Sequence, residues 1–195
     1  MQTEKLGADE LVGLIKTVFP GTPLGGNLIL LMDVPDRRVP DHAEWKARRE
    51  MAVEWTAILK ERIDQLAVER VLLFGYQNVG SNNADLPSEA FLWEKAEPPE
   101  DVDDLWRKGR ETSFENVFTT ARMMLAPTEF STTAPLKVAA QQRGFRAATM
   151  PGFTSAMIPA LRLDYEEIQR RVMLIKNKLD SAVSGKIRFL VDGKD

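Results

Sequence analysis

Few side chains in this sequence belong to the types that catalysis or metal binding requires. His42 is the only histidine and lies close to Asp41 and Glu44, where an imidazole could serve as a general base or a metal ligand. A zinc site normally needs three or four converging ligands, however, and the position one helical turn after His42 is Lys46. We therefore predict that His42 caps a helix or lies at the surface.

The remaining candidates for chemistry are also weak. The acidic pairs Asp103-Asp104 and Glu166-Glu167 fall in a loop and in a first helical turn, whereas a carboxylate pair that shares acid/base work needs a concave pocket. The chain has no cysteine, which excludes thiol catalysis, disulfides and thiolate zinc sites. We predict no catalytic residue, no metal site and no cofactor, and we do not expect an enzyme.

Charge and glycine placement exclude further classes of function. The formal net charge of −3 and the pI of about 5.4 oppose nucleic-acid binding, which requires a basic surface. Gly25-Gly26 precede a strand, whereas the glycines of nucleotide-binding loops follow one. The sequence shows no targeting segment and no apolar run long enough to cross a bilayer, so we expect no membrane partner and a cytoplasmic location.

The hydrophobic pattern predicts alternating strands and helices. Continuous apolar runs typical of strands buried on both faces alternate with amphipathic helical stretches. The predicted strands cover 27–33, 70–76, 123–126 and 146–149, and the predicted helices follow Asp9 and cover 41–69, 114–121 and 135–143. This order predicts an α/β fold with a mostly parallel, Rossmann-like sheet and helices on both faces. We expect one domain over 1–195, with an irregular connection at about 77–112.

Two of these helices carry specific expectations. In the longest helix, Trp45 and Trp55 lie on the apolar stripe and are predicted to be core residues, whereas Arg49 belongs to the solvated face. A last helix is expected to begin at Asp164 and to turn an apolar face toward the core. That face consists of Ile168, Val172, Ile175 and Leu179, and a terminal strand is predicted at 186–191.

The ends of the parallel strands are the first place to look for a ligand. The loops at 33–35, 76–78, 128–131 and 150–152 each follow a predicted strand and should converge on one sheet edge, where open α/β sheets bind ligands. Loops that merely connect elements would give the same pattern.

Several segments in order resemble the N-terminal domain of the thermophilic-type leucyl aminopeptidase family, which is M29-like. They are Leu31–Pro35, Trp45–Arg49, Ala52–Trp55, Ser131–Leu136, Gly144–Gly152 and Asp164–Ile168. The resemblance implies an α/β domain. In that family a further C-terminal domain supplies the Glu, His, Tyr and Asp metal ligands, and no residue of this chain can be matched to them.

The resemblance without a metal site leads to our functional prediction. We expect a non-catalytic peptide-binding protein, a truncated relative that presents a precursor peptide to a modifying enzyme in ribosomal-peptide natural-product biosynthesis. Strand addition along an exposed sheet edge at 90–93 would bind peptide through its backbone. The candidate contacts are Phe91, Leu92, Trp93, Tyr76, Asn78 and Trp106. An N-terminal fragment of an aminopeptidase and a structural domain that forms a homodimer remain alternatives.

Overall fold

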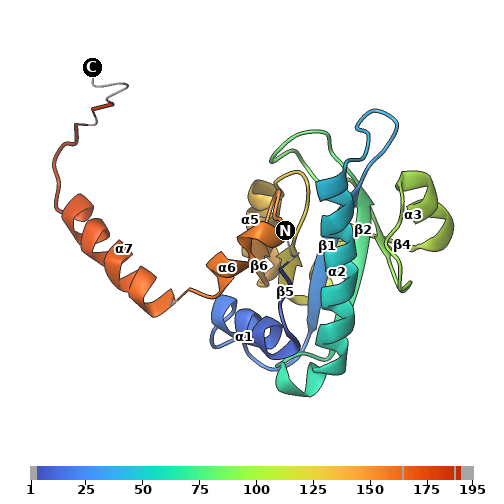
Figure 1. Cartoon of the computed structure of the whole chain (residues 1–195), viewed down its shortest axis with the longest axis horizontal. Helices are drawn as coiled ribbons and strands as arrows, with labels where there is room; N and C mark the ends of the chain where they lie inside the picture. Colours follow the sequence, from blue (N-terminus) through green and yellow to red (C-terminus); the bar gives the residue numbers. More distant parts are fainter. Residues whose placement is uncertain (1–3, 164, 187, 190–195) are drawn as a thin grey trace. The chain divides into compact units, whose positions relative to one another are not determined.

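The computed structural model describes residues 4–163, 165–186 and 188–189, and its centre is a six-stranded sheet in the order β4-β3-β2-β1-β5-β6 (Figure 1). The strands are β1 Asn27–Val34, β2 Arg70–Gln77, β3 Glu89–Leu92, β4 Arg110–Ser113, β5 Ala121–Ala126 and β6 Arg146–Thr149. Strands β2, β1, β5 and β6 run parallel, while β3 and β4 are antiparallel to their neighbours. The predicted α/β fold with a mostly parallel sheet is confirmed.

Strand β1 occupies the middle of this sheet. It pairs with β2 on one side and β5 on the other, and every residue from Leu28 to Val34 is buried. The chain moves from β1 outward to β2 and later returns to the far side of β1 with β5. The point where the strand order reverses therefore lies between β1 and β5, at the carboxyl ends of both.

Helices α1 (Ala8–Val18) and α2 (Ala43–Glu61) pack on one face of the sheet (Figure 1). Trp45 and Trp55 of α2 are buried, as predicted. The helix starts later than expected because His42 is its N-cap, with the His42 Nδ1 accepting from the backbone N–H of Trp45 at 3.4 Å. It also ends earlier, at Glu61, and a short 3₁₀ turn, η1 (Ile63–Gln65), follows. The capping role predicted for His42 is confirmed.

The prediction that Arg49 faces solvent is wrong. Its guanidinium is buried and donates to both carboxylate oxygens of Asp41, at 3.0 and 2.7 Å, and to the carbonyl of Pro99 at 3.2 Å. Burial alone would raise the pKa of Asp41, but the hydrogen bonds and the charge of Arg49 outweigh it, so this pKa lies below its ordinary value. The hydrogen bond of Arg49 to Pro99 ties α2 to the loop before α3.

The second face of the sheet carries α4 (Phe114–Thr120) and α5 (Thr133–Arg143). A core cluster unites both helices with alternate residues of the strands, including Ile29 and Leu31 of β1 and Tyr76 of β2. The ring centroids of Tyr76 and Phe114 lie 5.4 Å apart, as do those of Phe114 and Phe118. Helices on both faces are thus confirmed.

The segment predicted as an irregular connection is irregular over 78–88 and 93–101 but also contains regular elements. It contains β3, helix α3 (Val102–Lys108) and the start of β4, and the two strands extend the sheet beyond β2. Asp101 caps α3 by accepting from the N–H of Asp104 at 2.8 Å. Helix α3 packs against β2, where Gly75 leaves room for the buried side chain of Leu105.

The chain divides into two compact units, Met1–Ile158 and Pro159–Asp195. The first contains the sheet and ends with the 3₁₀ turn η2 (Ser155–Met157) and the start of α6 (Ile158–Leu161). The second contains α7, Tyr165–Asp180. The residues of this helix that were predicted to face the core are all exposed: Ile168, Val172, Ile175 and Leu179.

Two further predictions concern the end of the chain. The expected cap Asp164 and half of the expected strand at 186–191, namely 187, 190 and 191, lie outside the described residues. None of the helices in the described part of the chain has the length and apolar composition that crossing a bilayer requires.

Candidate functional site

The carboxyl ends of β1 and β5 meet, as predicted, but a buried carboxylate fills the space between them. Asp33 is 1% exposed and accepts hydrogen bonds from the Trp45 Nε1 at 3.0 Å and from the backbone N–H groups of Glu129 and Phe130 at 2.8 and 3.0 Å. Burial outweighs these bonds and raises the pKa of Asp33 to about 6. Asp33 therefore braces the loop after β5 at the edge where open α/β sheets bind ligands.

Other polar groups at this edge are also buried. The Tyr76 hydroxyl and the Thr132 Oγ1 are enclosed and have no hydrogen-bond partner among the residues that the structure describes. Burial, and secondarily the charge of Asp33, raises the pKa of Tyr76 well above its ordinary value, so the phenol stays neutral. Both hydroxyls are fully buried, so a ligand outside the core cannot contact them.

A chain of charges leads from this edge to the surface of α2. The buried Arg48 forms an ion pair with Glu129, and its Nε donates to the carbonyl of Phe153 at 2.8 Å. Glu129 also lies 3.3 Å from the His42 Nε2. Arg48 thereby fixes the loop after β5 and the loop after β6 to the same helix.

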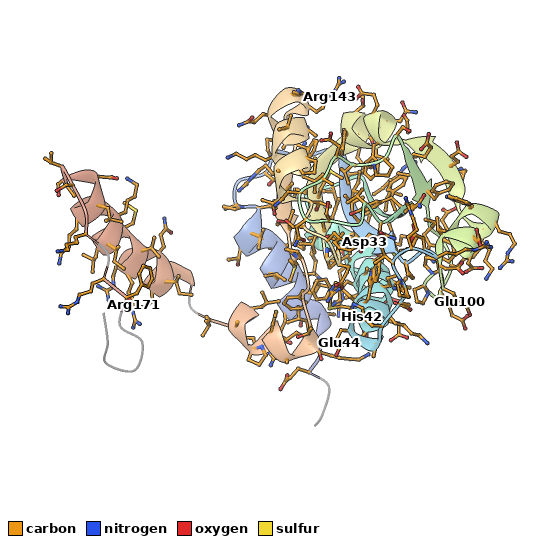
Figure 2. All side chains as sticks on the ribbon, turned by 90° about the horizontal axis from the view of Figure 1, so that it is seen from above. Asp33, His42, Glu44, Glu100, Arg143 and Arg171 are labelled. Carbon is orange, nitrogen blue, oxygen red and sulfur yellow. The ribbon has the colours of Figure 1, made fainter. Side chains whose placement is uncertain are left out.

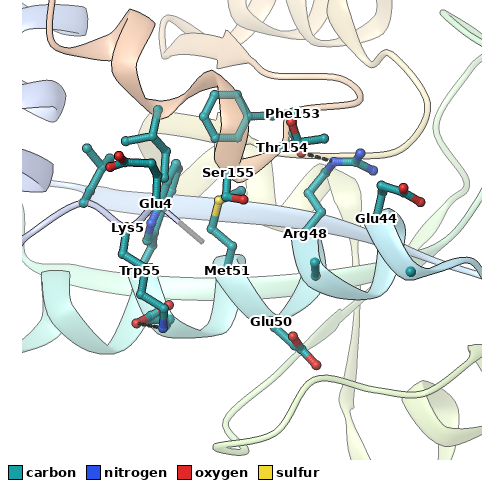
Figure 3. Close-up of a pocket in the computed structure, with 15 residues that line it drawn as sticks. Glu4, Lys5, Glu44, Arg48, Glu50, Met51, Trp55, Phe153, Thr154 and Ser155 are labelled. Atoms are coloured by element: carbon teal, nitrogen blue, oxygen red, sulfur yellow. Dashed lines mark hydrogen bonds and ion pairs between the residues drawn. The ribbon is translucent and has the colours of Figure 1, made fainter. Parts of the chain in front are cut away.

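The loop held by Arg48 forms one wall of a pocket against α2 (Figure 3). This first pocket has a volume of about 350 Å³, which lies in the range of small-ligand sites. Its apolar lining includes Met51 and Trp55 of α2 and Phe153 opposite them. Four glutamates also line it: Glu4, Glu44, Glu50 and Glu54.

A second pocket of about 540 Å³ lies between α2 and the segment that follows β3. Trp93 forms part of its wall, and its Nε1 donates to the carbonyl of Glu97 at 2.8 Å. Glu50 and Glu54 line this pocket as well as the first, so they form a ridge between the two. Figure 3 shows Glu50 on the side of α2 away from Phe153.

Acidic side chains outnumber basic ones around the two pockets. Glutamates at six positions line them, against four basic residues, one of which is the buried and already paired Arg48. Lys5 forms a 2.7 Å ion pair with Glu54 across the rim of the first pocket. The arrangement suits a ligand with apolar groups and positive charges.

The expected strand-addition site at 90–93 is wrong. Strand β3 pairs with β4 over its whole length and with β2 at Phe91 and Leu92, so it is not an edge strand. Phe91, Leu92 and Trp93 are at most 7% exposed. The sequence gives no sign of β4, because Arg110–Ser113 is polar and short, and this hidden neighbour is what converts a predicted edge strand into an internal one.

The remaining candidate contacts do not form one surface. Tyr76 lies in the core under α4, and Asn78 is buried with its Nδ2 donating to the carbonyl of Val34 at 3.0 Å. Trp106 on α3 is 51% exposed. Of the predicted set, Trp93 alone lines either of the two pockets beside α2.

The sequence reasoning missed most residues of these pockets. Met51 and Phe153 are isolated apolar residues outside the main stripe and strands, and Glu50 resembles any solvated helix residue. The buried network at the sheet edge, in contrast, had a signal in the sequence. Asp33 stands at the end of an apolar run, and a carboxylate that is buried there must find hydrogen-bond donors. Among the described residues, no three histidine or acidic side chains are grouped so that they could hold a metal ion.

Comparisons of the chain with protein families, with curated proteins and with solved structures find no match. The resemblance to the aminopeptidase domain therefore stays a prediction.

Proposed function

We propose that this protein is a non-catalytic peptide-binding protein that holds a basic, partly apolar peptide segment across α2. The observation that carries the proposal is the pair of pockets on either side of this helix, which share Glu50 and Glu54 as a common ridge. An extended segment that crosses the ridge would place apolar side chains in the pockets and a positive charge beside the two carboxylates.

The physical chemistry of the lining favours this ligand. Met51 is partly exposed and offers apolar surface to a ligand, while the buried Trp55 and Phe153 shape the pocket around it. Burial of the ligand's own apolar groups in this pocket contributes to the free energy of binding. The surrounding carboxylates add selectivity, since they attract lysine or arginine and repel acidic side chains. Arg48 is buried and paired with Glu129, so it keeps the pocket wall in place and its charge is already neutralised.

The proposal replaces strand addition as the mode of binding and keeps the predicted ligand class. Peptide is also the ligand class that the resemblance to a peptidase domain implies. Presentation of the bound segment to a modifying enzyme is part of the same proposal, because a peptide held at an open surface remains accessible to a second protein.

Binding of matched synthetic hexapeptides to the full chain tests the proposal. We expect the alternating Leu-Lys peptide to bind about tenfold more tightly than the Leu-Glu peptide, measured by isothermal titration calorimetry at low salt. Glu50→Lys should weaken binding of the Leu-Lys peptide about tenfold. Ala47→Trp should abolish it, because Ala47 lines the first pocket and the indole would fill that space.

Glu61→Lys is the matched control, since it makes the same charge change at the end of α2 outside both pockets. We expect it to leave the affinity within about twofold. Equal losses in the Glu50 and Glu61 variants would mean that only overall charge matters. Full affinity in the Ala47→Trp variant would place the peptide elsewhere, and either result contradicts the proposal.

A further inference from the structure

Helix α7 carries a narrow apolar seam that the other described residues of its own unit, Pro159–Asp195, leave exposed. Ile168, Val172, Ile175 and Leu179 are spaced by four, three and four residues, which is the spacing of core positions in a coiled coil. Their exposed fractions range from 38 to 68%. At 100° per residue the four side chains span only about 60° of the helix circumference.

The length of α7 shows why this seam needs a cover. The helix has 16 residues, and isolated helices of this length are marginal in water without tertiary packing. Intrahelical ion pairs of Glu167 with Arg170 and Arg171 help, but exposed pairs contribute little. Burial of the apolar seam is the larger available source of stability.

Basic residues flank the seam on both sides. Arg171 and Lys178 follow one border and Lys176 the other, at the positions that face a partner helix in a coiled coil (Figure 2 labels Arg171). Arg171 and Lys176 pair with Glu167 and Asp180 within the helix, but these pairs are exposed and can exchange for a partner's carboxylates.

The same charges oppose pairing of α7 with a second copy of itself. In a parallel pair, Arg171 of one helix would face Lys176 of the other, and symmetry repeats this contact. In an antiparallel pair, Arg171 would face Lys178. Both arrangements bring like charges together along the seam.

We propose that α7 is a docking helix for an acidic amphipathic helix of a different protein. Apolar residues of that helix would cover the four-residue seam, and its glutamates or aspartates would pair with Arg171, Lys176 and Lys178. A lipid surface fits less well, because helices that lie in a bilayer interface present one broad apolar face. Met173 and Leu174 are also exposed, but at 100° per residue they lie outside the seam and do not widen it into such a face. This inference does not rest on the pockets beside α2.

Binding of a synthetic acidic helix to the full chain tests the proposal. The probe is a labelled four-heptad peptide with Ile and Leu in its core positions and Glu at every flanking position; the comparison peptide has Lys instead. We expect the acidic peptide to bind at least about tenfold more tightly in fluorescence anisotropy. Ile175→Asp should remove this binding, whereas Asn177→Asp, on the opposite side of α7, should retain it.

Charge reversal makes the test independent of folding defects. The variant with Arg171→Glu, Lys176→Glu and Lys178→Glu should lose the acidic peptide and gain the basic one. Equal affinity for both peptides, an unaffected Ile175→Asp variant, or a stable dimer of the free chain in sedimentation would overturn the proposal. The proposal would also be overturned if the protein sedimented with vesicles that contain phosphatidylserine but did not bind the acidic peptide.

Discussion

At the scale of single residues, Asp33 shows how burial decides the behaviour of a carboxylate. Its pKa is raised to about 6, above the ordinary 3.8, because desolvation outweighs three groups that donate to it. The folded state therefore holds this proton more tightly than the unfolded state. At a pH above both pKa values, the ionised Asp33 carboxylate destabilises the folded state. This destabilisation decreases as the pH falls through 6 toward 4, because Asp33 takes up its proton in the folded state first.

The first prediction follows from this sign. Lowering the pH from 7 to 5 should add about 1 kcal/mol to the free energy of unfolding through Asp33, and the variant Asp33→Asn should lack this gain. Urea unfolding of both proteins at the two pH values measures the difference. The comparison uses the change in stability between the two pH values and not the absolute stability. The amide introduced at position 33 would place its own N–H group against the N–H of Phe130 and destabilise the variant at both pH values. Identical pH responses in the two proteins would show that Asp33 does not titrate in this range.

At the scale of elements, the turn between α3 and β4 requires a residue without a side chain, Gly109. Gly109 follows α3 with an ordinary backbone conformation, but a Cβ there would lie 2.7 Å from the carbonyl oxygen of Leu105 and 2.9 Å from the Cβ of Phe91. Neither atom can move without shifting the helix or β3. The turn thus sets how closely α3 approaches the sheet.

We expect Gly109→Ala to destabilise the protein by about 2 kcal/mol in chemical denaturation, since the added methyl group overlaps rigid atoms. Gly13→Ala provides the contrast. Gly13 lies inside α1, and no atom of the described residues outside its own helical turn comes within 4 Å of where a methyl group would lie. Alanine there should stabilise by about 0.5–1 kcal/mol through helix propensity. A neutral Gly109→Ala variant would mean that α3 can withdraw from the sheet without cost.

At the scale of the whole molecule, the division at Ile158 separates a packed unit from a helical one. The unit Met1–Ile158 contains all six strands and the buried core on both faces of the sheet. In the second unit, the apolar residues of α7 are exposed. Stability should therefore belong to the first unit.

A chain ending after Ile158 tests this division. We expect it to unfold cooperatively with a melting temperature within about 2 °C of the full chain, measured by circular dichroism. It should also bind the Leu-Lys peptide, because every residue lining the two pockets is retained. It should lose the acidic helical peptide together with α7. A large fall in melting temperature would show that the second unit contributes to the fold.

Local patterns in the sequence were sufficient for the four parallel strands and for the presence of the core helices. β6 was predicted at its observed bounds, and β1, β2 and α4 within one residue, because continuous apolar runs and helical periodicity reflect burial directly. The capping role of His42 also followed from its neighbours. These features depend on contacts between residues that are close in the chain.

Features that depend on distant segments required the tertiary structure. Strand β3 resembled an edge strand until the polar β4 paired with it, and Arg49 resembled a surface residue until Asp41 and Pro99 enclosed it. The pockets beside α2 combine residues from segments as far apart as Glu4 and Phe153, which no local pattern connects. For the seam of α7, periodicity identifies an apolar face and leaves open whether this chain or another protein covers it.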